Sequence, residues 1–162
     1  EIVMTGRTPY QGPFEGTSAG DKEAVYRAFS LTKADKLKDK KFAVLSGGEK
    51  QKIVIARAVA QTTPWMLLDE PIASLDIKNQ IEIMKTLLEL NRQEGVSVLM
   101  VLHDINLAGI YCDRLIMLKD GQVIAAGNTN ECLCEENLKK LYDISFFHMD
   151  TKKGQRYYYA EV

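Results

Sequence analysis

The alternation of short apolar runs with helical patterns between residues 65 and 112 constrains the fold of this chain most strongly. Trp65 to Leu68 and Val96 to Leu102 are typical of buried strands. After Asp76 the apolar residues recur at helical spacing, and another helix is expected over about 105–112. Strand, helix, strand and helix in this order predict an α/β fold with a mostly parallel sheet.

The N-terminal part is expected to be helical and rich in loops. Residues 5–20 contain four glycines and two prolines, which predict turns. Asp21 is placed to cap a short helix that follows it. Ser46 opens the clearest helix, over about 48–61.

The C-terminal part is expected to alternate hairpins with one short helix. Asp120-Gly121 separates two apolar runs, at 115–118 and 122–126, which is a strong hairpin signal. A helix is expected over 135–142 and a second hairpin from 146–149 and 157–161. No change in composition marks a boundary, so the chain is expected to form a single domain.

Composition narrows the classes of function. The chain is 46% apolar and 27% charged, as in an ordinary globular domain. Its charge of 21 − 22 = −1 provides no basic field, so no nucleic-acid partner is expected. The apolar run Val98 to Leu102 is far shorter than the ~20 residues of a membrane helix. Three cysteines without metal-pair spacing indicate a reducing compartment.

The segment Ser46-Gly47-Gly48-Glu49 is the first candidate for chemistry. Ser46 and Glu49 fit the Ser-x-x-Glu capping box, so one interpretation is a helix start and nothing more. Two glycines inside the box, however, leave the helix entrance without side chains, and a ligand can approach the backbone there. The N–H groups of a helix N-terminus and a serine hydroxyl favour an anion, and we expect a phosphate.

Polar residues follow both predicted strands. Asp69 and Glu70 lie at the carboxyl end of the first, where α/β proteins place ligands, and His103 follows the second. One carboxylate could hold Mg²⁺ and the other could orient or deprotonate a water. The alternative is a pair of solvated loop acids and a polar loop histidine. Asp76 is explained as the cap of the following helix.

These segments together resemble the motifs of ABC-type ATPases. LSGGEKQ at 45–51 resembles the family's signature, WMLLDEP at 65–71 its Walker B strand, ASLD at 73–76 its D-loop, and His103 its switch histidine. The order and spacing also fit, with 69 − 45 = 24 and 103 − 69 = 34 residues between them. The resemblance implies part of a P-loop NTPase core in a single truncated domain over 1–162. Residues 1–44 would be part of the helical subdomain, and 45–162 the signature helix and second part of the core.

The resemblance also implies roles for these residues in ATP hydrolysis with Mg²⁺. The nucleotide-binding set would be Ser46, Gly47, Gly48, Glu49 and Asp76. The signature serine and glycines would grip the γ-phosphate of an ATP held by a partner subunit, and Asp76 would help couple the two sites. Asp69 would support Mg²⁺ through water. Glu70 would be the general base, and His103 would bond the γ-phosphate.

A finer likeness concerns transport. GRTPY at 6–10, LDIKNQIEIM at 75–84 and residues 103–127 are similar to the subgroup that powers uptake of iron chelates, haem and cobalamin. The implied partners are a second nucleotide-binding domain, arranged head to tail, and transmembrane permease subunits. The implied location is the cytoplasmic face of the cell membrane.

One departure from the family limits what this chain can do. GxxxxGK[ST] is missing, and no glycine is followed by lysine, so the chain has no phosphate-cradling P-loop. We therefore expect the chain alone neither to bind ATP tightly nor to hydrolyse it, and exposed apolar sheet surfaces to favour self-association. Two alternatives remain: a non-enzymatic half-domain that lends its signature to a partner, and a soluble non-transport ATPase, which the compact spacing disfavours.

Overall fold

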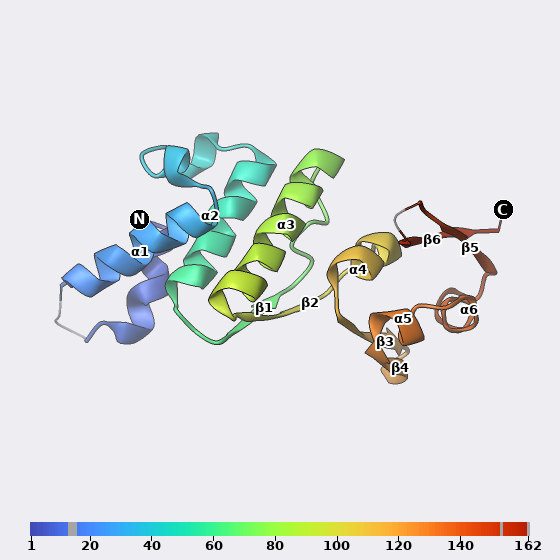
Figure 1. Ribbon diagram of the computed structural model, residues 1–162. Coiled ribbons are helices and arrows are strands. Elements are labelled where there is room, and N and C mark those ends of the chain that lie inside the picture. Colours follow the sequence, from blue (N-terminus) through green and yellow to red (C-terminus); the bar gives the residue numbers. More distant parts are fainter. Residues whose placement is uncertain (13–15, 153, 162) are drawn as a thin grey trace. The chain divides into compact units, whose positions relative to one another are not determined.

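The computed structural model describes residues 1–12, 16–152 and 154–161. The chain forms two compact units, Glu1–Val101 and Leu102–Val162, and each is described by itself (Figure 1). None of the described helices is both long and apolar enough to cross a membrane. The structure has the mixed helix and sheet content that the sequence predicts, with parallel pairing of the first two strands.

The first unit contains three α-helices, three 3-10 helices and two strands within its described residues. Along the chain they are η1 (Val3–Tyr10), α1 (Ala19–Leu31), η2 (Asp35–Leu37), η3 (Phe42–Val44), α2 (Gly47–Ala60), β1 (Trp65–Leu68), α3 (Ile77–Glu94) and β2 (Ser97–Met100). Figure 1 shows α1, α2 and α3 side by side. The predicted helices and strands of this region are confirmed to within three residues at their ends.

The prediction of turns over residues 5–20 is wrong for residues 5–10, which belong to η1, and residues 13–15 of that range lie outside the described residues. Tertiary contacts explain the difference. Gly6 packs so closely on α2 that a Cβ there would lie 2.2 Å from the carbonyl oxygen of Arg57. Arg7 donates from Nη1 to the carbonyl oxygen of Ala60, 2.9 Å away, at the end of α2. Glycine and proline residues in a sequence indicate local turns, but they give no information on tertiary contacts of this kind.

The cap of α1 also differs from the sequence prediction. Ser18 is the N-cap, and its Oγ accepts a hydrogen bond from the Asp21 N–H at 3.0 Å. Asp21 is the third helical residue, and its carboxylate accepts in return from the Ser18 N–H at 3.0 Å. The two residues form a capping box, so Asp21 helps the helix start from inside its first turn.

The parallel pairing of β1 with β2 aligns Trp65 with Ser97 and Leu68 with Met100. The prediction that these strands are buried is wrong for one face: Leu67 is 73% and Leu99 is 51% exposed, while Met66 is 5% exposed. An apolar run is expected where both sheet faces are covered, and the described part of this unit covers one. The apolar run in the sequence does not show which face of the sheet is covered.

The core of the first unit lies mainly between η1, α1 and α2. Its buried apolar residues are Val3, Val25, Ala28, Phe29, Ala34, Leu37, Leu45, Ile53, Ala56 and Ala60. On α3 the buried residues Ile83, Leu87 and Leu90 recur at helical spacing, whereas Ile77, the first apolar residue after Asp76, is 75% exposed. Leu45, directly before the candidate site at the start of α2, belongs to the core.

The second unit is built on two hairpins. Its elements are α4 (Ile105–Tyr111), β3 (Arg114–Lys119), β4 (Gln122–Asn128), α5 (Thr129–Cys132), α6 (Glu135–Tyr142), β5 (Phe146–Asp150) and β6 (Arg156–Ala160). Asp120 and Gly121 both have positive φ, as a two-residue hairpin turn requires. Both predicted hairpins and the helix over 135–142 are confirmed, while α5 was not predicted.

Candidate functional site

The first turn of α2 carries the predicted capping box. Ser46 is the N-cap, and its Oγ accepts from the Glu49 N–H at 3.3 Å. The Glu49 carboxylate turns back and accepts from the Ser46 N–H at 2.9 Å. Its other oxygen accepts from Lys40 Nζ at 3.0 Å. These bonds hold the pKa of Glu49 below its usual value, with the Ser46 N–H the largest cause. Lys40 thereby offsets the negative charge beside the turn.

The two glycines differ in their surroundings. Gly47 is exposed, and Gly48 is buried. In the described part of the chain, neither of their N–H groups has a hydrogen-bond acceptor within the protein, as expected for the first turn of a helix. Ser46 is exposed, and its hydroxyl accepts one bond while it keeps a proton to donate. This turn therefore has donors suited to an anion.

The acidic pair lies where β1 ends. Asp69 and Glu70 are both exposed, and the chain turns there, with the Ala73 N–H donating to the Glu70 carbonyl oxygen at 3.3 Å. Glu70 has a φ of 43°, in the left-handed region that costs a non-glycine residue on the order of 1 kcal/mol or more. Strain of this kind is often found at functional sites.

Asp69 suits a magnesium ion that is shared with a ligand. The described residues contain no group of three or more His, Cys, Asp and Glu side chains that could hold a metal ion. Mg²⁺ is commonly bound by one or two carboxylates together with water and substrate phosphates. One exposed carboxylate at a strand end fits that arrangement, and a cage made only of protein ligands does not fit these residues.

Asp76 caps α3, as predicted. Its Oδ1 accepts from the Asn79 N–H at 2.9 Å, and its Oδ2 accepts from Asn79 Nδ2 at 2.7 Å. These bonds hold the pKa of Asp76 below its usual value, with the backbone bond from Asn79 the largest cause. Because the carboxylate stays ionised, it also complements the positive end of the helix dipole.

The structure brings the glycine turn and the start of α3 together. Asn79 lies against Gly48, where a Cβ would be 2.3 Å from its Oδ1, and Leu75 Cδ2 lies 3.7 Å from the Cβ position of Gly47. The sequence alone does not point to Asn79, because a position one helical turn after a cap gives no signal of the contact with Gly48. His103 is exposed and precedes Asp104, the N-cap of α4, in the second unit. Its position relative to Glu70 stays a prediction.

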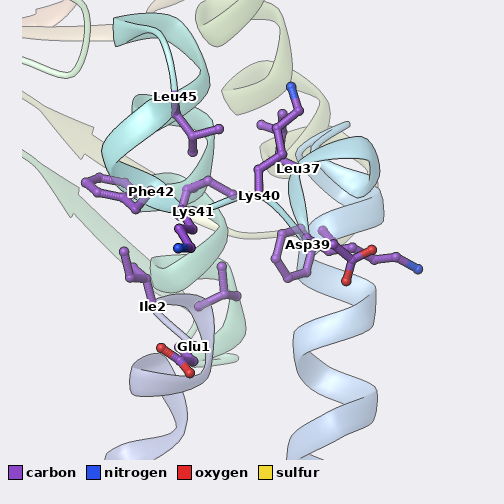
Figure 2. Close-up of a pocket in the computed structure, with 12 residues that line it drawn as sticks. Glu1, Ile2, Leu37, Asp39, Lys40, Lys41, Phe42 and Leu45 are labelled. Atoms are coloured by element: carbon purple, nitrogen blue, oxygen red, sulfur yellow. The ribbon is translucent and has the colours of Figure 1, made fainter.

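A pocket of about 390 Å³ lies elsewhere in the first unit (Figure 2). Apolar side chains such as Phe29 and Phe42 line it, and Lys38, Lys40 and Lys41 lie at the same pocket. It includes Leu45 but none of the predicted site residues. Ser46, Asp69 and Glu70 of the candidate site are exposed, so a ligand can reach them from solvent.

Comparisons with known proteins agree with the motifs. The family model for ABC transporters matches residues 5–73. The chain is 39% identical over 150 residues to the ferric enterobactin transport ATP-binding protein FepC of Escherichia coli K12, covering 93% of this chain and 55% of that protein. It is also 39% identical over 145 residues to the probable siderophore transport system ATP-binding protein YusV of Bacillus subtilis, covering 90% and 53%.

Solved structures show the same fold. A metal-chelate type ABC transporter in an inward-facing conformation matches with a TM-score of 0.93 and 27% identity, covering 99% of this chain and 66% of that chain. The ATP-binding cassette MJ0796, in a dimeric post-hydrolysis state with ADP and phosphate, matches with a TM-score of 0.63 and 32% identity, covering 79% and 54%. The chain spans about half the length of the curated relatives it matches.

Proposed function

Because the chain belongs to the family of ABC transporter ATP-binding proteins, we propose that it contributes the signature turn and the catalytic carboxylates to a transport ATPase. The P-loop, which its sequence lacks, comes from another segment or subunit. The chain together with that part is called the complete ATPase below. The observation that carries this proposal is the first turn of α2, with two glycines, an exposed serine and N–H groups without acceptors in the described protein.

The proposed roles are those that the family's motifs imply, and they suit the chemistry of phosphoryl transfer. The hydroxyl of Ser46 and the N–H groups of Gly47 and Gly48 bind the γ-phosphate of ATP held by a partner, and the Glu49 carboxylate keeps the turn in shape. Such donors stabilise charge that spreads over the phosphoryl oxygens. Asp69 would hold a magnesium ion through water, and the ion would supply positive charge beside the phosphates. His103 donates a hydrogen bond to the γ-phosphate.

Glu70 is the general base of the proposed reaction. It accepts a proton from the water that attacks the γ-phosphate, while Asp76 couples this site to the second one of a head-to-tail pair of nucleotide-binding domains. The strained backbone of Glu70 supports this role, because residues in the left-handed region cluster at functional sites. Positioning of catalytic groups contributes much of the rate in enzymes.

The proposed cargo is an iron chelate. The support is the names of relatives, which include transport proteins for ferric enterobactin, achromobactin and petrobactin, together with the metal-chelate type transporter of similar fold. In that setting the chain works with permease subunits at the cytoplasmic face of the membrane. A half-domain that only lends its signature turn to a partner ATPase is the second candidate, supported by the missing P-loop.

Replacing Glu70 with Gln in the complete ATPase tests the proposed chemistry. We expect turnover to be lost and ATP binding to be kept, because Gln fills the same space but cannot take up a proton. Glu23→Gln on the exposed surface of α1 is the matched control and should turn over normally. Normal turnover by the Glu70→Gln protein would remove Glu70 from the role of base.

A second measurement concerns the chain by itself. Without the P-loop lysine and its backbone cradle most phosphate contacts are missing, so the purified 162-residue chain should show no magnesium-dependent ATP hydrolysis. Activity should appear when the part that bears the P-loop is added. If the chain alone hydrolysed ATP strongly and Glu70→Gln abolished this activity, the result would contradict the proposal that the P-loop must come from another segment or subunit.

A further inference from the structure

The N-terminal turns of α2 and α3 are in direct contact, although Asn79 lies 31 positions after Gly48 along the chain. The amide of Asn79 lies over Gly48, where an added Cβ would be 2.3 Å from Oδ1 and 2.5 Å from Cγ. Real side chains essentially never approach so closely. The Asn79 amide can therefore occupy this position because residue 48 is a glycine.

The Asn79 amide is held from its other side by Asp76. Nδ2 of Asn79 donates to Asp76 Oδ2 at 2.7 Å, and the Asn79 N–H donates to Oδ1 at 2.9 Å. A carboxylate that accepts two bonds from one residue fixes the orientation of that side chain. The amide can move off Gly48 only if it breaks its side-chain bond to the cap of α3.

One turn further along, an ion pair joins the same two helices. Lys52 Nζ of α2 lies 2.8 Å from Glu82 Oε2 of α3, and this pair is partly buried. The pKa of Glu82 is lowered chiefly by the hydrogen bond from Lys52. The two contacts at successive turns resist both sliding and rotation of α2 against α3.

We propose that Asn79 is a positioning residue that locks the glycine turn of α2 to the capped start of α3, so that Ser46-Gly47-Gly48 and Asp76 move as one body. The proposal rests on the proposed function, in which both segments contact or couple the nucleotide sites. Asn79 itself touches no nucleotide in this arrangement. It acts by keeping the donors of the α2 turn at one spacing from Asp76, and small displacements of such donors are costly to catalysis.

The first test measures amide hydrogen exchange in the purified chain. Asn79→Ala should raise exchange of the Glu49 and Lys50 amides, which both donate to Ser46, by roughly tenfold relative to the rest of α2, because the local opening cost falls. Asn91→Ala is the matched control: this asparagine of α3 donates from Nδ2 to the backbone carbonyl of Val96, near the other end of the helix. Equal effects of the two variants on the α2 turn would overturn the proposal.

The second test uses Gly48→Ala, which places a methyl group against the Asn79 amide. Combining it with Asn79→Ala removes that clash, so the double variant should fold with a higher thermal midpoint than Gly48→Ala alone. Additive losses would show that the two residues do not share the contact. The thermal midpoints do not depend on nucleotide, so this test is valid whether or not the proposed function is correct.

The third test measures steady-state kinetics of the complete ATPase. Asn79→Ala should lower kcat by roughly tenfold while the ATP concentration at half-saturation changes little, since the P-loop still holds the nucleotide. Asn91→Ala should keep both values. Faster exchange at the α2 turn with unchanged kcat would leave Asn79 as a packing residue only and overturn its positioning role. An inactive wild-type protein would instead contradict the proposed function.

Discussion

At the scale of single residues, Arg7 shows how one side chain fixes a segment that local signals leave undefined. Its Nε lies 2.9 Å from Asp21 Oδ1, and its Nη1 bonds the carbonyl oxygen of Ala60 at 2.9 Å. Its guanidinium also lies over the ring of Tyr10, 3.9 Å from the centroid. One cation thus joins η1, the start of α1 and the end of α2, so the N-terminal segment depends on it.

The partner of Arg7 gives a prediction about pH. The bond from Arg7 is the largest cause that lowers the pKa of Asp21 from 3.8 to about 2. A carboxyl whose pKa is lower in the folded state stabilises the fold above its unfolded pKa. That contribution is lost as pH falls from 3.8 through about 2.

Asp21→Asn should therefore lower the thermal midpoint at pH 7, and its difference from the wild type should shrink as pH falls through this window. Glu23→Gln, on the exposed side of the same helix, is the control and should change little. Thermal unfolding followed by circular dichroism at several pH values measures both. A constant difference down to the lowest pH would show that the Arg7 bond is not its source.

At the scale of elements, sequence patterns predicted the structural features that depend on residues close together along the chain. The hairpin at Asp120-Gly121, the cap of α3 and the parallel order of β1 and β2 all follow from local signals. The prediction failed for η1, which long-range contacts shape, and for the exposed face of β1. In the candidate site, the motif residues were identified from sequence, but the contact of Asn79 with Gly48 depends on helix packing that spacing does not encode.

The two capping boxes of the first unit allow a matched prediction. Ser18 caps α1 and Ser46 caps α2 in the same way. Replacing either serine with alanine should lower the free energy of unfolding by about 1 kcal/mol, measured by urea denaturation. In the complete ATPase, Ser46→Ala should also reduce turnover, whereas Ser18→Ala should not. Equal turnover in the two variants would contradict a role for the Ser46 hydroxyl beyond capping.

At the scale of the whole molecule, the exposed face of β1 and β2 decides how the chain behaves in solution. Trp65, Leu67, Leu99 and Val101 are all at least half exposed, and the register places Leu67 beside Leu99. The sheet in this described unit has two strands, so both outer edges also lack a strand partner. Apolar faces of this kind mark surfaces that other protein covers.

We therefore expect the isolated chain to self-associate. Sedimentation velocity should show species larger than a monomer, with a share that rises with concentration. Leu67→Lys places a charge on the face and should shift the distribution towards monomer, whereas Tyr26→Lys, at an exposed position of α1, should not. A stable monomer at all concentrations for the wild-type chain would contradict this expectation.

The central claim is that the first turn of α2 binds the γ-phosphate of ATP. Amide hydrogen exchange of the complete ATPase carrying Glu70→Gln, with and without ATP and magnesium, tests it most directly, because this variant should keep ATP intact. The account predicts that exchange of the Gly47, Gly48 and Glu49 amides slows when ATP is added. Unchanged exchange of these amides in protein saturated with ATP would contradict it.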